Sequence, residues 1–291
     1  MSKVCFYLSA VIILALSPLW SAIAATGFKD DTSECRNLLD SQNYTKAVSI
    51  CTQDAEAGDS AAQFNLSLMY SSGWGVSKND AEALKWLRAS ADQRYPPAQY
   101  TLASHYGAGT GVLKDSKEAV RLLLDAAEQG FVLAQMQLGS MYERGYQRLE
   151  IKPEISVAIN WYRQAAVQCD ACQVELWRIY YFGLGVDKDY VEAARHLKKA
   201  ADAGLPQAQM QLAFRYLEGE GVPKDNVHAY KWFYIAEKAG EPRAKRALPL
   251  LSRNMSRSEI AEAKTLADET TAKFVINTNL LCALYNQFCG K

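Results

Sequence analysis

The chain has 291 residues, 49% of them hydrophobic, and its 32 Lys and Arg residues balance 32 Asp and Glu residues. This composition is typical of a folded protein and excludes a chain that is disordered throughout. The balanced charge provides no basic excess of the kind that nucleic-acid binding needs, so we expect no nucleic-acid partner. The length fits one extended domain or two compact ones.

The first part of the chain differs in composition from the rest. A lysine precedes an apolar run from Val4 to Leu16, and an Ala-x-Ala sequence follows at Ala22 and Ala24. A basic start, an apolar centre and small residues at the end are the parts of a secretory signal peptide. We therefore predict a signal peptide over residues 1–25.

The alternative is a retained membrane anchor, because the apolar stretch is almost long enough to span a bilayer. Pro18 and the small residues favour cleavage instead. We expect a mature protein that begins at Ala25 or Thr26 and is periplasmic or secreted. Its only membrane contact would then be through the signal peptide, before cleavage.

Six cysteines remain after Cys5, and an even number in an exported chain indicates disulfides. Six cysteines allow 15 complete pairings. Their clustering along the chain favours three local bonds, which we predict to be Cys35–Cys51, Cys169–Cys172 and Cys282–Cys289.

One of these pairs forms a Cys-x-x-Cys motif, which serves redox chemistry when it opens a helix in a thioredoxin-like fold. The sequence gives no sign of that fold. Cys169 replaces a turn glycine and Cys172 replaces a small residue at a helix start. We therefore favour a structural disulfide at a tightened turn over a redox site.

A phrase of the form Tyr-x-x-Gly-x-Gly-Val recurs along the chain. It is found near Tyr70, Tyr106, Tyr181 and Tyr216, with a divergent copy at Tyr142. The stretch before each copy, "AQFNLSLMY" in the first, also recurs, and its starts lie 36, 36, 38 and 36 residues apart. A period of this length predicts a solenoid of paired helices.

The Gly-x-Gly pairs raise the alternative of a phosphate-binding loop. They are Gly73–Gly75, Gly109–Gly111, Gly183–Gly185 and Gly219–Gly221. A phosphate loop is normally a single feature that follows a strand, whereas these four each follow a predicted helix. We interpret them as one helix–helix corner used four times, with the first glycine just past a helix end.

The complete phrase, roughly Ala-x-x-x-Leu-Gly-x-x-Tyr-x-x-Gly-x-Gly-Val with a second helix ending Ala-Ala-x-x-Gly, resembles the SEL-one-like repeat family, which is related to the tetratricopeptide repeats. The resemblance covers Ala62 to about Ala244. It implies an all-α, right-handed α-solenoid of antiparallel helix pairs that serves as a binding scaffold. The expected order is a signal peptide (1–25), an N-terminal half repeat (26–61), five repeats (62–243), capping helices (244–271) and a tail with a cysteine pair (272–291).

A binding surface is predicted from the positions that vary between repeats. In the first helix of each repeat, positions four, seven and eight vary while positions one, two, five and nine do not. First helices line the concave face of such solenoids, which is the usual binding face. The candidate binding residues are Asn65, Leu68, His105, Trp177, Arg178, Phe214 and Arg215. The alternative is that these side chains only meet the terminal extensions.

We find no residues that indicate catalysis, a metal or a cofactor. The three histidines fall in different repeats without metal-ligand spacing, and no Gly-x-Ser-x-Gly motif is present. The main hypothesis is an exported scaffold that binds another protein in the periplasm or cell envelope as an adaptor, regulator or assembly factor.

Two alternatives follow from the resemblance. Cysteine-rich members of the family are linked to β-lactam binding or hydrolysis, but they carry a cysteine pair in nearly every repeat, and repeats one, two and five here have none. Other members belong to envelope machines such as flagellar motors. The identity of the partner and the stoichiometry stay open.

Overall fold

The computed structural model describes residues 33–286, and it describes side chains from residue 33 to residue 272 except that of Arg148. Within these limits the regular structure is helical, apart from an isolated antiparallel bridge between Tyr146 and Ile151. No helix in the described part of the chain has both the length and the apolar character that crossing a membrane requires. The predicted signal peptide lies outside the described residues.

The chain divides into two compact units, Met1–Cys169 and Asp170–Lys291. The helices of the first unit are α2 (Glu34–Asp40), α3 (Tyr44–Glu56), α4 (Ser60–Ser72), α5 (Asp80–Asp92), α6 (Pro96–Ala108), α7 (Ser116–Glu128), α8 (Val132–Arg144), the 3-10 helix η1 (Gln147–Leu149) and α9 (Ile155–Ala165). Those of the second are α10 (Asp170–Phe182), α11 (Tyr190–Asp202), α12 (Pro206–Glu218), α13 (Asn226–Lys238), α14 (Pro242–Ser252) and α15 (Arg257–Asn286).

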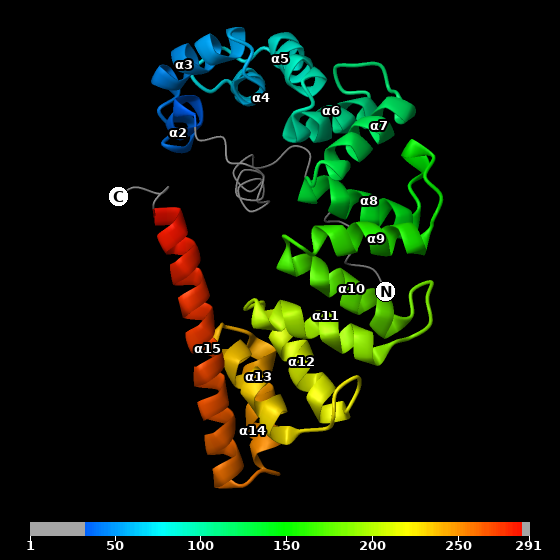
Figure 1. Cartoon of the computed structure of the whole chain (residues 1–291), viewed down its shortest axis with the longest axis vertical. Helices are drawn as coiled ribbons and strands as arrows, with labels where there is room; N and C mark the ends of the chain where they lie inside the picture. The colour runs from blue at the N-terminus through cyan, green and yellow to red at the C-terminus, as the bar shows by residue number, and fades with distance from the viewer. Residues whose placement is uncertain (1–32, 287–291) are drawn as a thin grey trace. The chain divides into compact units, whose positions relative to one another are not determined.

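In each unit, consecutive helices pack side by side as antiparallel pairs (Figure 1). Small residues permit this close approach. Ala62, Ala98, Ala134 and Ala208 at the first-helix starts are all buried, as are Ala83, Ala119, Ala158, Ala193 and Ala229 in the second helices. The predicted all-α solenoid of helix pairs is thus confirmed. Alanine, leucine and aromatic side chains make up much of the hydrophobic clusters of each unit.

The corner interpretation of the Gly-x-Gly pairs is also confirmed. Gly219 ends α12 in the left-handed conformation (φ 74°), and its N–H donates to the carbonyl oxygen of Arg215 at 2.8 Å. Gly221 has φ 75°, and a Cβ added there would lie 1.8 Å from the carbonyl oxygen of Tyr190 in the preceding helix pair. Asp225 then caps α13 by accepting hydrogen bonds from two backbone N–H groups.

The N-terminal half repeat is held together by a disulfide. Cys35 in α2 and Cys51 in α3 are bonded, with their Cα atoms 4.8 Å apart, and both side chains are fully buried. The predicted Cys35–Cys51 bond is confirmed.

The second predicted disulfide, Cys169–Cys172, is not formed in the structure. The sulfur of Cys172 occupies the position that alanine holds in the other repeats, so its side chain is directed into the helix packing and is fully buried. Cys169 is partly exposed. The third predicted pair, Cys282–Cys289, lies outside the residues whose side chains are described.

The C-terminal cap consists of α14 and α15, both packed against α13. Ala263 and Ala267 are buried in this contact. Helix α15 continues to Asn286, through residue 272, where the sequence placed the start of a separate tail.

The third repeat has a longer corner than the others. Between α8 and α9 the chain turns through η1, and the backbone N–H of Tyr146 donates to the carbonyl oxygen of Ile151 at 2.8 Å. This turn directs Leu149 into the core, where its side chain is only 8% exposed. A Cβ added at Gly107 in α6 would lie 3.3 Å from Cδ2 of Leu149, so the corner reaches back to the preceding repeat.

Candidate binding surfaces

Two of the predicted binding residues, Asn65 and Leu68, are buried, and this part of the prediction is wrong. Asn65 is 2% exposed and its Nδ2 donates to Sγ of Cys35 at 3.7 Å, because α2 of the half repeat packs over α4. Leu68 is 8% exposed and belongs to the same hydrophobic cluster as Leu102 and Ala103 of the next repeat. Asn65 therefore meets the N-terminal half repeat and not solvent.

His105 is partly exposed at the end of α6. Its Nδ1 lies 2.8 Å from the carbonyl oxygen of Thr110, so the ring is bonded to its own corner. It lies in the first unit, whereas the remaining candidates Trp177, Arg178, Phe214 and Arg215 lie in the second. The structure therefore does not join His105 to them in one site.

The second unit contains an aromatic–arginine cluster, formed by Trp177, Tyr181, Phe182, Tyr190 and Arg215. The ring of Tyr181 is at its centre. The centroid of its ring lies 5.6 Å from that of Trp177, 4.9 Å from that of Phe182 and 5.4 Å from that of Tyr190. The guanidinium carbon of Arg215 lies 4.4 Å from the Tyr181 ring centroid, close enough for a cation–π contact. Three helices, α10, α11 and α12, thus contribute to one cluster.

Arg215 is a buried member of this cluster that contacts the Tyr181 ring. This corrects the prediction that Arg215 is a binding residue on the exposed face. The residue is 7% exposed. Its Nη2 pairs with Oε2 of Glu218 at 2.8 Å, and its Nη1 pairs with Oε2 of Glu220. Because both carboxylates and the Tyr181 ring surround the guanidinium, its charge is balanced inside the protein and is not presented to solvent.

Tyr181 is held by the same ion pair. Its hydroxyl donates to Oε2 of Glu220 at 2.9 Å. Burial, aided by this hydrogen bond to a carboxylate, raises the pKa of Tyr181 above its usual value. The phenol therefore stays neutral, and its ring is fixed between Arg215 and the neighbouring aromatic side chains.

The outer part of the cluster is open to solvent. Phe182 is 53% exposed and Tyr190 is 36% exposed. The Trp177 ring lies 6.1 Å from that of Phe182, and its buried Nε1 has no hydrogen-bond partner in the described part of the protein. Exposed aromatic side chains on a rigid base are typical anchors at protein interfaces.

The other two candidates lie near this region with different surroundings. Arg178 is partly exposed, and its Nε pairs with Oε2 of Glu175 at 3.0 Å. Phe214 is partly buried and meets Phe233 edge to face, with centroids 5.0 Å apart. Phe214 thus belongs more to the hydrophobic core of the second unit than to its surface.

Sequence reasoning missed Tyr181, Phe182 and Tyr190. The first two precede the corner glycine, where the other repeats have Ser71–Ser72, Gly107–Ala108, Glu143–Arg144 and Leu217–Glu218. Two adjacent aromatic residues in columns that hold no aromatic residue in the other repeats were a signal, and they directly follow the helix positions that were compared.

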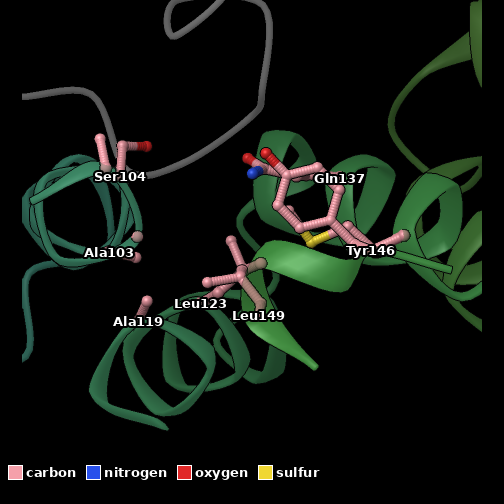
Figure 2. Close-up of a pocket in the computed structure, with 10 residues that line it drawn as sticks. Ala103, Ser104, Ala119, Leu123, Gln137, Tyr146 and Leu149 are labelled. Atoms are coloured by element: carbon pink, nitrogen blue, oxygen red, sulfur yellow. The ribbon is translucent and has the colours of Figure 1, made fainter. Parts of the chain in front are cut away.

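The first unit contains a cavity of about 70 Å³ (Figure 2). It lies between α6, α7, α8 and the long corner of the third repeat. Figure 2 shows Leu123 and Leu149 between Ser104 on one side and Gln137 and Tyr146 on the other. The lining residues are Ala103, Ser104, Gly107, Ala108, Ala119, Leu123, Gln137, Met141, Tyr146 and Leu149.

In the part of the chain that the structure describes, no group of three or more His, Cys, Asp or Glu side chains is placed to hold a metal ion. His196 is buried and bonded to Gln173 and Glu192, so it is a packed core residue.

The family model of the Sel1 repeat matches residues 60–95, 96–131, 132–166, 173–205 and 206–241. Among solved structures, a protective antigen of uropathogenic Escherichia coli with an SLR fold is 32% identical, with a TM-score of 0.62 over 85% of this chain and 52% of that one. A Sel1 repeat protein from Oxalobacter formigenes is 28% identical, with a TM-score of 0.61 over 81% of this chain and 97% of that one. The chain spans about half the length of the E. coli antigen. No curated protein sequence matches it significantly.

Proposed function

The chain belongs to the Sel1 repeat family, and on that premise we propose that it is an exported scaffold that binds another protein through the aromatic–arginine cluster of its second unit. Sel1 repeat proteins mediate protein–protein interactions and are generally non-enzymatic scaffolds. The finer role, as an adaptor, regulator or assembly factor in the periplasm or cell envelope, is part of the proposal.

The main support for this function is that Phe182 is exposed next to the buried, charge-balanced group of Arg215 and Glu220. Phe182 and Tyr190 present apolar surface to solvent, while Arg215 and Glu220 hold the Tyr181 ring beneath them. An aromatic patch whose base is already ordered loses little conformational freedom on binding, which favours affinity. The surface is therefore suited to a protein partner that covers it with apolar side chains.

The proposed location rests on the N-terminal sequence and on one disulfide. The Cys35–Cys51 bond joins two buried cysteines, and such bonds form and persist in oxidising compartments such as the periplasm. Mass spectrometry of the protein from the envelope fraction tests export. A mature start at Ala25 or Thr26 is expected, and an intact Met1 or Ser2 would contradict cleavage.

Binding is tested by crosslinking in the envelope fraction, followed by capture of the tagged protein. We expect Phe182→Ala and Trp177→Ala to lose the crosslinked species, because truncating such an anchor typically costs about 2 kcal/mol or more, roughly thirtyfold in affinity. Leu113→Ala is the matched control, because Leu113 is an exposed apolar corner residue (91% exposed) outside the cluster.

A second control separates binding from folding. Leu138→Ala in the buried core of the first unit should lower stability by about 2–5 kcal/mol through a cavity. If Phe182→Ala and Trp177→Ala both capture the partner as the unaltered protein does, and their melting temperatures are unchanged, the partner does not use this surface.

A further inference from the structure

The cavity of the first unit lies at the same repeat positions as the aromatic–arginine cluster of the second. Aligning the corner glycines Gly109 and Gly183 pairs Ala103 with Trp177, Ser104 with Arg178, Gly107 with Tyr181 and Ala108 with Phe182. Four small residues of repeat two therefore stand where repeat four has four large ones. Large side chains, three of them aromatic, occupy these positions in repeat four, whereas the small side chains of repeat two leave a cavity there.

The walls of this cavity come from separate parts of the fold. Leu123 of α7 and Met141 of α8 are buried beside the small residues of α6. Leu149 reaches the cavity from the long corner of repeat three (Figure 2). It closes the side next to Gly107 of α6. The other repeats have shorter corners, so the longer corner of repeat three is what completes the cavity.

The chemistry of the lining is apolar with a neutral polar rim. None of its residues is charged. Ser104 and Tyr146 are exposed and Gln137 is partly exposed, so hydroxyl and amide groups surround the opening. The Ser104 hydroxyl donates to the carbonyl oxygen of Tyr100 at 3.3 Å and keeps lone pairs that accept.

The size of the cavity restricts its occupant. Its volume of about 70 Å³ exceeds the roughly 10–15 Å³ that one water needs. It is far below the roughly 300 Å³ or more of a site for a whole small molecule. A volume between these two limits is suited to one side chain of a larger molecule.

We propose that this cavity binds a single aliphatic side chain, of the size of leucine or methionine, from a partner polypeptide. The side chain packs against Leu123, Met141 and Leu149. The amide of Gln137 and the hydroxyl of Ser104 bond to the backbone beside it, as extended peptides require. The inference rests on the proposed protein-binding function, but it concerns a different repeat and a different unit from the aromatic–arginine cluster.

The test uses the full mature protein with 13C-labelled methionine methyl groups and the probe N-acetyl-L-leucine methylamide, titrated into the millimolar range. Met141 lines the cavity, whereas Met69 and Met210 are buried elsewhere and serve as internal references. We expect a saturable shift of the Met141 methyl signal, with the Met69 and Met210 signals unchanged.

Three variants test whether the signal comes from the cavity. Ala108 is an exposed lining residue at the opening, so Ala108→Leu should block entry and weaken the response about tenfold or more. Arg144→Leu places leucine at the same helix position in repeat three and should leave the response unchanged. Leu149→Ala should widen the cavity, so that N-acetyl-L-phenylalanine methylamide binds better than it does to the unaltered protein.

Three results would overturn the inference: no Met141 shift, an equal shift in Ala108→Leu, or a Met141 shift that depends on protein concentration without probe. The last would assign the cavity to a second copy of the chain. The probe reports on the cavity alone. If it does not bind, while capture of the partner still depends on Phe182, the cavity proposal is rejected and the proposed function is kept.

Discussion

The side-chain amide of Gln93 donates a hydrogen bond of 2.8 Å to the side-chain carbonyl of Gln63, thirty residues earlier in the chain. The Nε2 of Gln63 in turn donates to the carbonyl oxygen of Ala55 at 3.1 Å. The hydrogen bond between the two glutamine side chains recurs one repeat later, where Nε2 of Gln129 donates to Oε1 of Gln99 at 2.7 Å. A buried glutamine at the second position of the first helix thus receives a hydrogen bond from the residue that ends the second helix.

The same hydrogen bond is missing in repeats three and five. Gln135 and Gln209 still donate to Ala127 and Ala201, at 3.0 and 3.2 Å. Their buried Oε1 atoms have no partner within the described structure. Thirty residues after Gln209 stands Ala239, which has no side-chain donor. A buried carbonyl without a hydrogen bond costs stability.

We therefore predict that Ala239→Gln stabilises the protein by about 1 kcal/mol, because the new amide reaches the unsatisfied Oε1 of Gln209. Ala239 is exposed at the C-cap of α13, as Gln93 is at the C-cap of α5. Urea unfolding measures the change. Ala203→Gln is the matched control and should give no gain, because the Oε1 of its counterpart Gln173 is already bonded to His196. Equal gains from both variants would contradict the hydrogen-bond explanation.

The second corner glycine should matter most where the neighbouring backbone is nearest. Gly111 and Gly221 have φ values of 71° and 75°, so alanine is strained at both. A Cβ at Gly221 would lie 1.8 Å from the Tyr190 carbonyl oxygen, whereas one at Gly111 would meet only Leu84 Cδ2 at 3.7 Å. We expect Gly111→Ala to cost about 1 kcal/mol and Gly221→Ala at least about 2 kcal/mol more. Similar unfolding midpoints for the two variants would refute this difference.

His196 should make stability depend on pH. Burial lowers the pKa of His196 to about 4, and the positive charge of Arg195 acts in the same direction while Glu192 opposes it. The unfolded value is about 6.5, so the unfolded chain binds the proton more readily. Stability is then lost as the pH falls from about 6.5 towards about 4.

Between pH 6.5 and pH 4.5 we expect the unaltered protein to lose roughly 2–3 kcal/mol relative to His196→Leu. Leucine is the residue of the same column in repeat two, Leu122. Urea unfolding at a series of pH values gives the two slopes. Hydrogen bonding to Arg195 lowers the pKa of Glu192 to about 2, so its contribution is lost only below about pH 4.5 and does not overlap this window. Parallel slopes would show that His196 is not the titrating group.

The Cys35–Cys51 bond should stabilise the half repeat that covers α4. The two cysteines are 16 residues apart in sequence, and closing a loop of this length contributes on the order of 3 kcal/mol. Adding a reductant should therefore lower the unfolding midpoint. The double variant Cys35→Ala, Cys51→Ala should begin lower and show no further change on reduction. A reductant effect that persists in the double variant would point to another bond.

Local patterns were sufficient to predict the repeats, the corners and one disulfide. The Gly-x-Gly pairs follow from turn chemistry within a few residues, and the helix pairs follow from the spacing of alanine, leucine and tyrosine. Cys35 and Cys51 are 16 residues apart and lie on the two adjacent helices of the half repeat, so their spacing in the sequence was enough to predict the pair. The predicted Cys169–Cys172 bond is not formed in the structure, because the spacing of two cysteines along a chain does not fix the side-chain geometry that a disulfide requires.

The sequence by itself determined that this protein is a stack of helix pairs, because each repeat satisfies its own turns and its own close packing. Only the tertiary structure decided which variable side chains reach solvent. Asn65 was predicted to be exposed and is covered by α2, while Arg215 is enclosed by Glu218, Glu220 and Tyr181. Leu149 meets Gly107 because a long corner folds back. These contacts join residues from different helices, and burial depends on what packs over a position, which a repeating local pattern does not encode.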